Sequence, residues 1–148
     1  MTNETLLAAF IETYFSTMKN INDLISRPMA AYKLSFEQYQ ILHDIAQSDE
    51  ISLTDIVKKR RVTKPAIARQ LRVLRDLNYI HQEQSQQDRR RFLLHLTPSG
   101  VRVEQAVTHA AAEQFNHWVN ILGTDKAEQL LALLNEVGAK LMQPDEAE

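Results

Sequence analysis

Two groups of arginines have the side-chain chemistry to bind a polyanion. Arg69 and Arg72 are three residues apart on a predicted helix. Arg89, Arg90 and Arg91 are consecutive in a predicted turn. A guanidinium group can donate two parallel hydrogen bonds to O6 and N7 of guanine, and it can enter a narrow minor groove where the negative potential is enhanced. The residue types therefore indicate contacts with duplex nucleic acid.

The first group lies on a helix predicted over residues 65–77. At 100° per residue, Ile67, Leu71 and Leu74 cluster on one side, which must face a hydrophobic core. The opposite side carries Pro65, Ala68, Arg69, Arg72 and Asp76. Its N-terminal half is small or basic, as a helix entering the major groove requires, so we expect Arg69 and Arg72 to contact bases.

The residues that lead into this helix suit phosphate oxygens. Thr63 can cap the helix, and Pro65 fits the first turn, where its missing N–H costs nothing. Lys64, Thr63 and the free N–H groups of the first turn are expected to bind phosphate, and Ala66 permits close approach. Asp76 lies one turn beyond the arginines, where it can pair with Arg72.

The second group lies at the tip of a predicted hairpin. Residues 80–84 and 92–96 have the pattern of two strands, and the polar segment between them is too long for a two-residue turn. Such a hairpin has the form of a wing whose Arg90, aided by Arg89 and Arg91, enters the minor groove. Asp88 is expected to fix one arginine and to cap the turn through backbone N–H groups.

Helix signals surround both groups. Ser35 with Gln38 and Ser52 with Asp55 have the spacing of capping boxes, which predicts helices over 36–47 and 53–60. The buried face of the first of these is expected to comprise Phe36, Tyr39, Leu42, Ile45 and Ala46. Residues 50–53 can form no more than a stub of strand. Asn78 takes the place of the glycine that commonly ends a helix.

Apolar residues at heptad spacing mark both ends of the chain. In a helix predicted over 5–31 they are Leu7, Ile11, Tyr14, Met18, Ile21 and Ile25, and after Thr124 they are Ala127, Leu130, Leu134, Val137 and Leu141. A heptad seam faces a partner helix, so pairing with a second copy of the chain is expected. Pro28 should end or kink the first helix. A long helix is predicted from Pro98 to Gly123.

The fold class that follows is mainly α (α+β), a winged helix-turn-helix with N- and C-terminal dimerisation helices. Residues 35–97 form the predicted DNA-binding region, and residues 1–34 and 98–148 form the predicted dimerisation helices. The charge agrees: Lys58–Arg102 holds twelve lysines and arginines and three acids, a net +9, whereas the remainder carries −11. A basic centre with acidic flanks indicates a polyanion-binding module.

The composition of the 148 residues excludes several other classes of protein. The absence of cysteine excludes disulfides, zinc fingers, a cysteine nucleophile and a thiol sensor. No apolar run approaches the roughly 18 residues that span a bilayer, and Met1–Glu4 lacks the basic start of a secretory signal, so we expect a cytoplasmic protein without membrane partners. No Gly-rich phosphate loop and no recognisable catalytic pair occur, so we expect neither an enzyme nor a cofactor.

Short segments between Ser52 and Gly100 form a pattern of their own. They are Leu53-Thr54-Asp55-Ile56, Val62-Thr63-Lys64-Pro65-Ala66-Ile67-Ala68-Arg69, Leu74 with Tyr79-Ile80, Asp88-Arg89-Arg90 and Leu96-Thr97-Pro98-Ser99-Gly100. Together they resemble the MarR family of bacterial transcription regulators. The resemblance implies a homodimer on a pseudo-palindromic operator, usually a repressor released by a small-molecule effector.

The resemblance also assigns residues. Thr63–Ala66 and Arg69 match the major-groove segment of the family, and Asp88 and Arg90 match its wing pair. This chain departs from the pattern at Asn78, where family members usually have glycine, and at Ala66 and Ala68, where many have polar residues. Base contacts here are therefore expected to depend more on Arg69, Arg72 and the wing.

Three alternatives remain open at the level of sequence. The family's effector pocket could be lined by Tyr14, Met18, Tyr39 and His43, although ordinary core packing explains each of them better. His109, Glu113 and His117 lie on one helix face and could bind a metal, but solvated or interface histidines are the favoured interpretation. A winged helix used for protein contact would not need the arginine wing, and salt-insensitive binding would indicate it.

Overall fold

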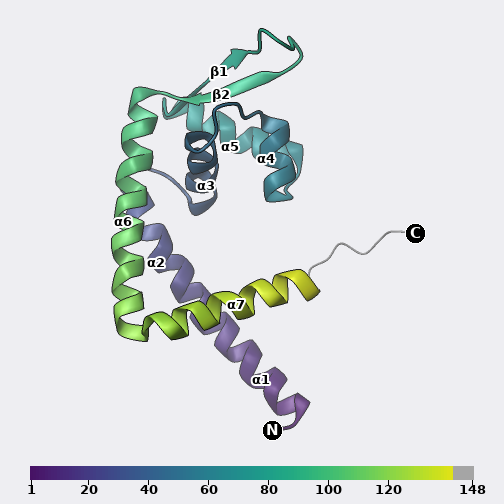
Figure 1. The fold of residues 1–148 in the computed structure, drawn as a ribbon, viewed down its shortest axis with the longest axis vertical. Coiled ribbons are helices and arrows are strands. Elements are labelled where there is room, and N and C mark those ends of the chain that lie inside the picture. Colours follow the sequence, from purple (N-terminus) through teal and green to yellow (C-terminus); the bar gives the residue numbers. More distant parts are fainter. Residues whose placement is uncertain (142–148) are drawn as a thin grey trace, which may run out of the picture. The chain divides into compact units, whose positions relative to one another are not determined.

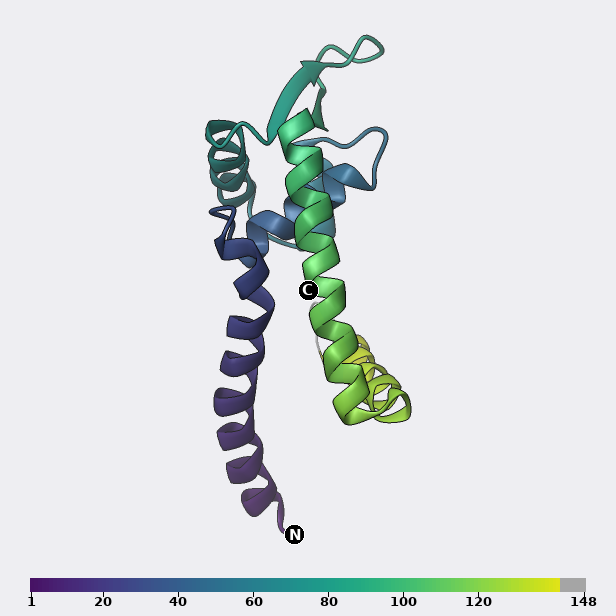
Figure 2. The same cartoon turned by 90° about the vertical axis from the view of Figure 1, so that its left-hand side faces the viewer.

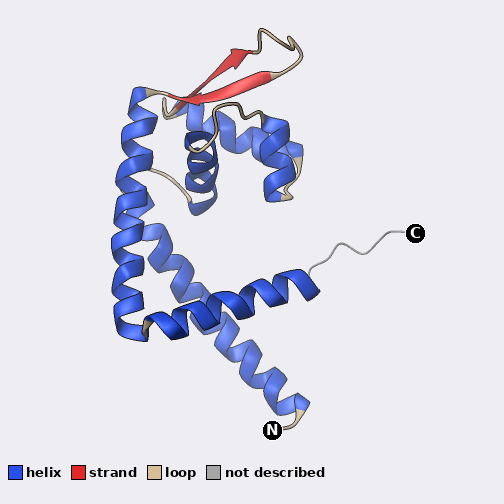
Figure 3. Cartoon of the chain, in the orientation of Figure 1, coloured by secondary structure: helices blue, strands red, loops and turns tan. Residues whose placement is uncertain are grey.

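The structure, a computed structural model, describes residues 1–141 and contains two units, Met1–His109 and Ala110–Glu148. The C-terminal residues 142–148 of the predicted dimerisation region lie outside the described residues. Figure 3 shows a mainly helical chain with one two-stranded sheet in the described part. The elements are α1 (Asn3–Thr13), a π-helical segment (Tyr14–Met18), α2 (Lys19–Ala30), α3 (Phe36–Ala46), α4 (Leu53–Arg60), α5 (Lys64–Asp76), β1 (Ile80–Gln84), β2 (Phe92–Leu96), α6 (Pro98–Leu122) and α7 (Thr124–Leu141).

The first predicted helix is continuous but not uniform. A π-helical segment over Tyr14–Met18 lies within it, and the Ser16 hydroxyl in this segment donates to the Glu12 carbonyl at 2.9 Å. The prediction offered two outcomes at Pro28, an end or a kink. The helix does not end there, because α2 continues to Ala30. Pro28 has no N–H to donate to the backbone ladder, and α2 ends two residues after it.

The core of the first unit lies among α3, α4, α5, the hairpin and the start of α6 (Figures 1 and 2). Its fully buried side chains include those of Leu42, Ile56, Leu74 and Val107. Both predicted capping boxes form and set the first residues of α3 and α4. The predicted buried face of α3 needs one correction: Ala46 is exposed, and Ile41 is buried instead. Ala46 ends the helix and is turned 100° beyond Ile45, away from the core.

The predicted hairpin forms with its predicted bounds. β1 and β2 pair antiparallel, from Ile80 opposite Leu96 to Gln84 opposite Phe92. We call residues 80–96 the wing. The segment before α4 contributes no strand, only one backbone hydrogen bond, from the Leu94 N–H to the Ile51 carbonyl at 2.8 Å. This bond attaches the second strand of the wing to the start of α4.

The junction between α5, the wing and α6 is tightly built. Asn78 adopts the left-handed conformation expected of it, with φ 60°. Its carbonyl accepts the Thr97 hydroxyl at 2.7 Å, and Thr97 caps α6 by accepting the Gly100 N–H at 2.9 Å. A Cβ at Gly100 would lie 1.9 Å from the Tyr79 carbonyl oxygen, so only glycine fits at this position.

The second unit comprises the C-terminal part of α6 and α7, separated by Gly123 at φ 94° as predicted. None of the described residues of α7 is buried, although its heptad seam is apolar. Within residues 1–141, no helix combines the length and the apolar character that a membrane span requires.

Candidate nucleic-acid interface

Helix α5 presents the two faces predicted for it. Ile67, Leu71 and Leu74 are at most 3% exposed and pack into the core. On the other side Arg69 and Arg72 are exposed, together with Pro65 and Asp76, and Ala68 is half-buried. The core contacts of the inner face therefore fix the outward direction of both arginines.

Two of the three arginines of α5, Arg69 and Arg72, have no polar partner within the described chain, whereas Arg75 donates to the Gln82 side chain at 2.7 Å. No hydrogen bond or ion pair joins Arg69 or Arg72 to another of the residues 1–141. The pair expected between Arg72 and Asp76 is absent there as well. Both side chains are exposed to water, and a cation four residues before an acid is the weaker orientation of a helical ion pair.

The first turn of α5 also lacks a side-chain cap. Thr63 has the extended backbone of an N-cap, with φ −65° and ψ 150°, but its side chain makes no capping hydrogen bond. Lys64 is exposed beside it. The predicted capping role of the Thr63 hydroxyl is therefore wrong, and the hydroxyl and the first-turn N–H groups retain their capacity for an outside partner.

The tip of the wing is ordered by backbone contacts. Asp88 Oδ1 accepts the Arg90 N–H at 3.0 Å, as the predicted cap of the turn requires. The Gln84 side-chain amide donates to the Arg89 carbonyl at 2.7 Å. The side chains of Arg89 and Arg90 are exposed, and neither is bound to Asp88 in the part of the chain that the structure describes.

Arg91 differs from its two neighbours. Its guanidinium Nη2 donates to Asp55 Oδ2 on α4 at 2.7 Å. The expectation that the Asp88 carboxylate fixes the side chain of one wing arginine is therefore wrong for the described residues, where the carboxylate that binds a wing arginine is Asp55. The same carboxylate accepts the Ser52 N–H at 2.9 Å and the Ser52 hydroxyl at 3.0 Å. The hydrogen bond from the Ser52 backbone, aided by the Ser52 hydroxyl, Arg91 and Lys58, lowers the pKa of Asp55 below its ordinary 3.8 against the opposing effect of burial.

A cleft of about 470 Å³ runs between the start of α4, the start of α5 and the wing. It brings Lys64 and Arg90 together with Lys58, a cation that the motif analysis did not single out. Its walls are formed by Ser52, Leu53, Thr54, Asp55, Lys58, Lys64, Gln82, Asp88, Arg90, Arg91 and Phe92. The arginines of α5 are not among the residues that line it.

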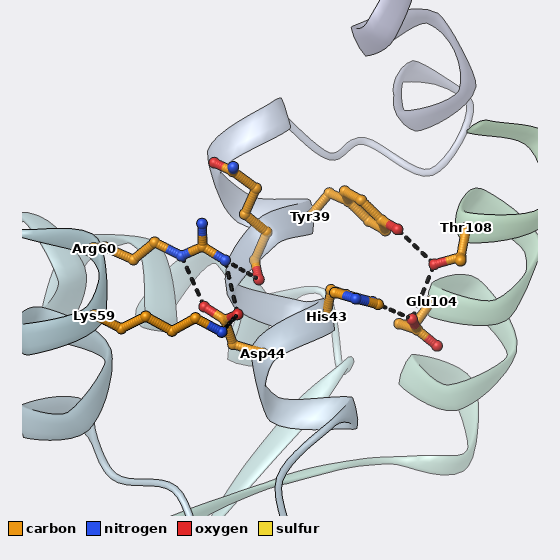
Figure 4. Close-up of polar contacts among 8 residues, drawn as sticks. Tyr39, His43, Asp44, Lys59, Arg60, Glu104 and Thr108 are labelled. Carbon is orange, nitrogen blue, oxygen red and sulfur yellow. Dashed lines mark hydrogen bonds and ion pairs between the residues drawn. The ribbon is translucent and has the colours of Figure 1, made fainter. Parts of the chain in front are cut away.

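Asp44 on α3 binds two cations of α4 (Figure 4). Arg60 donates Nε to Oδ2 at 2.8 Å and Nη2 to Oδ1 at 2.7 Å, and Lys59 Nζ donates to Oδ1 at 2.7 Å. Asp44 is only 2% exposed, and the sequence analysis missed it. Two of the cations counted in the basic centre therefore neutralise an internal carboxylate.

A second polar group joins α3 to the beginning of α6 (Figure 4). His43 Nδ1 lies 2.8 Å from Glu104 Oε1, and the same oxygen accepts the Thr108 hydroxyl at 2.9 Å. The Tyr39 hydroxyl lies 2.5 Å from Thr108 Oγ1. Tyr39 and His43, two of the four candidate pocket residues, are thus committed to contacts with α6.

The third candidate site is a metal site at His109, Glu113 and His117. Within residues 1–141, no group of three or more histidine, aspartate or glutamate side chains has the arrangement of a metal site, and this holds for these three residues as well.

Comparison with known proteins agrees with this architecture. Residues 32–91 match the sequence model of the MarR family. An HTH-type transcriptional regulator of Staphylococcus aureus is 25% identical over 136 residues, which cover 82% of this chain and 90% of that protein.

Two solved structures from the same organism share the fold. S. aureus MarR in complex with salicylate and kanamycin is 23% identical, with a TM-score of 0.79 and coverage of 97% of this chain and 96% of that one. A S. aureus MepR–DNA complex is 23% identical, with a TM-score of 0.73 and coverage of 94% and 98%. Residues 32–91 therefore resemble the MarR family, and the chain shares the winged helix-turn-helix fold of these two structures.

Proposed function

We propose that this protein is a sequence-specific regulator that binds double-stranded DNA as a homodimer on a pseudo-palindromic operator. One observation carries the proposal: α5 buries Ile67, Leu71 and Leu74 and thereby turns Arg69 and Arg72, without partners in residues 1–141, toward the outside. Arginine fixed on the outer face of a helix can donate two hydrogen bonds to guanine in the major groove. A MepR–DNA complex of the same fold supports this use.

Each element of the surface has its own role in this proposal. Arg69 and Arg72 contact bases, and Pro65, Ala66 and Ala68 let the helix approach the groove closely. Thr63 and Lys64 hold phosphate at the uncapped start of α5. Arg90, aided by Arg89, enters the minor groove, with Asp88 ordering the turn beneath them.

The proposed homodimer accounts for the apolar surface at both ends of the chain. In the described residues Leu7, Ile11, Tyr14 and Met18 of the first seam are exposed, as are Leu130, Leu134, Val137 and Leu141 of the second. An apolar groove of about 510 Å³ lies between α6 and α7 within the second unit. Contiguous exposed apolar surface of this kind marks an interface. We assign dimerisation to residues 1–34 and 98–148 and DNA binding to residues 35–97.

The regulatory part of the proposal is repression relieved by a small molecule. A S. aureus MarR of this fold binds salicylate and kanamycin. Here Tyr39 and His43 bind the start of α6, so a ligand that competed for these groups would loosen the connection between α6 and the DNA-binding region. A regulator of transcription acts where the chromosome is, which for a bacterial protein is the cytoplasm.

Salt-dependent binding tests the proposal. Duplexes are selected from a random pool by the wild-type protein, and their dissociation constants are measured between about 50 and 200 mM salt. If a dimer neutralises ~8 phosphates, affinity should fall by roughly 10³–10⁵ over this range. Light scattering of the free protein should give twice the chain mass. A monomer, or a complex insensitive to salt, would contradict the proposal and favour protein contact.

A further inference from the structure

We infer that Arg91 is a positioning residue, which holds the wing in its orientation through Asp55 rather than contacting DNA itself. The inference rests on the proposed DNA-binding function and separates the roles of three consecutive arginines. It differs from the expectation that Arg91 enters the minor groove together with Arg90.

The side-chain contacts concern the Asp55 carboxylate, which Ser52 orients for Arg91. The Asp55 carboxylate is already oriented by the N–H and the hydroxyl of Ser52 when the Arg91 guanidinium binds it at 2.7 Å. Charge-assisted hydrogen bonds of this length are among the stronger polar contacts in proteins. An arginine held in this way would have to give up a carboxylate before it could bind a phosphate.

The backbone contacts make Arg91 the base of the wing tip. Its N–H donates to the Asp88 carbonyl at 2.9 Å, and its carbonyl accepts the Ser85 N–H at 2.9 Å. Fixing Arg91 therefore fixes both ends of the loop that carries Arg89 and Arg90. An isolated two-stranded hairpin is marginal in water, so such a loop needs a support outside its own sheet.

A second contact joins the same two segments. The Leu94 N–H donates to the Ile51 carbonyl at 2.8 Å, three residues beyond Arg91 and four residues before Asp55. Two contacts restrict rotation of the wing against α4 more than either one alone. Arg89 and Arg90 remain exposed, so the tether leaves their guanidinium groups available for DNA.

The physical effect of the tether is to order the wing before binding. A wing that moves freely must be ordered when DNA binds, and this lost freedom weakens the complex. Removing the tether should therefore lower affinity without removing a phosphate contact. A direct phosphate contact would also change the salt slope by about one per subunit.

The main test uses Arg91→Gln, which leaves the Ser52–Asp55 capping box intact. We expect about two- to fivefold weaker binding to a selected duplex, an unchanged salt slope, and lower ¹⁵N heteronuclear NOE values and faster hydrogen exchange of amides 85–91 in the free protein. Arg91→Lys, which keeps the charge, should restore most of the affinity. Arg102→Gln, which removes an exposed charge on α6, is the matched control.

A second variant separates the two roles by the sign of its effect. Asp55→Asn releases Arg91: a positioning role predicts weaker DNA binding, whereas direct contact predicts stronger binding. The loss in the double variant should be smaller than the sum of the two single losses, because both changes break the same Arg91–Asp55 pair, although Asp55→Asn also alters the Ser52 contacts. A salt slope lowered by about one in Arg91→Gln, with unchanged mobility of the wing, would overturn the inference.

The proposed function and the tether can fail separately. If the wild-type protein selects no duplex, the proposed function fails, yet the mobility of amides 85–91 in free Arg91→Gln still tests the tether. If the wild type binds DNA and these amides are as rigid in Arg91→Gln as in the wild type, only the tether fails.

Discussion

Arg60 and Asp44 form a two-point ion pair that joins α4 to α3. The guanidinium Nε and Nη2 lie 2.8 and 2.7 Å from the two carboxylate oxygens. Burying a carboxylate is costly unless its oxygens are paired, and here three donor contacts fill that role. The pair sets the position of α4, and α4 in turn carries Asp55 toward the wing.

We predict that Asp44→Asn destabilises the protein by about 1.5–3 kcal/mol, the range for hydrogen bonds to charged groups. Lys59→Ala, which removes the outermost partner of the same carboxylate, should cost less than about 1 kcal/mol because the Lys59 side chain is 59% exposed. Urea unfolding measures both. Similar small losses for the two variants would show that Asp44 does not hold the helices together.

Gly100 should not tolerate a side chain. Because a Cβ there would meet the Tyr79 carbonyl, we expect Gly100→Ala to destabilise the protein by about 1–3 kcal/mol. Gly138→Ala is the matched control: nothing in the described chain lies within 4 Å of its Cβ position, and alanine in a helix gains up to about 1 kcal/mol over glycine. Thermal unfolding in which both variants shift alike would contradict the tight junction.

Asp55 makes the stability of the protein depend on acid. Its pKa is lower folded than its ordinary 3.8, so its contribution is complete above pH 3.8 and is lost as the pH falls through the folded value. We therefore expect Asp55→Asn to lower the melting temperature near neutral pH and to converge with the wild type below pH 3.8. A constant difference down to the lowest pH at which both fold would refute this linkage.

Arg90 should contribute a phosphate-dependent contact at the wing. We expect Arg90→Ala to weaken binding to every duplex and to reduce the salt slope by about one per subunit. Fluorescence anisotropy at several salt concentrations measures both quantities. If slope and affinity stay at wild-type values, the wing has no part in DNA binding.

Local signals were sufficient to predict most of the helices and both strands of the fold. Ser52 and Asp55 lie three residues apart and set the start of α4, and the polar segment between two apolar strands sets the wing. The outward direction of Arg69 followed from the period of Ile67, Leu71 and Leu74 alone. Each of these patterns involves residues that are close together in the sequence, so each can be recognised from the sequence alone.

Long-range polar pairs could not be predicted in the same way. Asp44 and Arg60 are separated by 16 residues in the sequence, and His43 and Glu104 by 61. No pattern of local spacing therefore predicts either contact. The π-helical segment over Tyr14–Met18 has no signature in the sequence: Ser16 in it and Ser26 in regular helix both donate to the carbonyl four residues before. Arg91 has the same type and neighbourhood as Arg90, and only the packing of α4 against the wing distinguishes them.

Binding of Arg69→Ala to a selected duplex and to random duplex shows whether the outer face of α5 reads bases. We expect a loss of about 1–3 kcal/mol on the selected duplex, relaxed preference at one base pair of each half-site, and a much smaller loss on random duplex. Arg102→Ala, outside the proposed surface, should leave both affinities unchanged. Equal losses on selected and random DNA would contradict a base-contacting role for the outer face of α5.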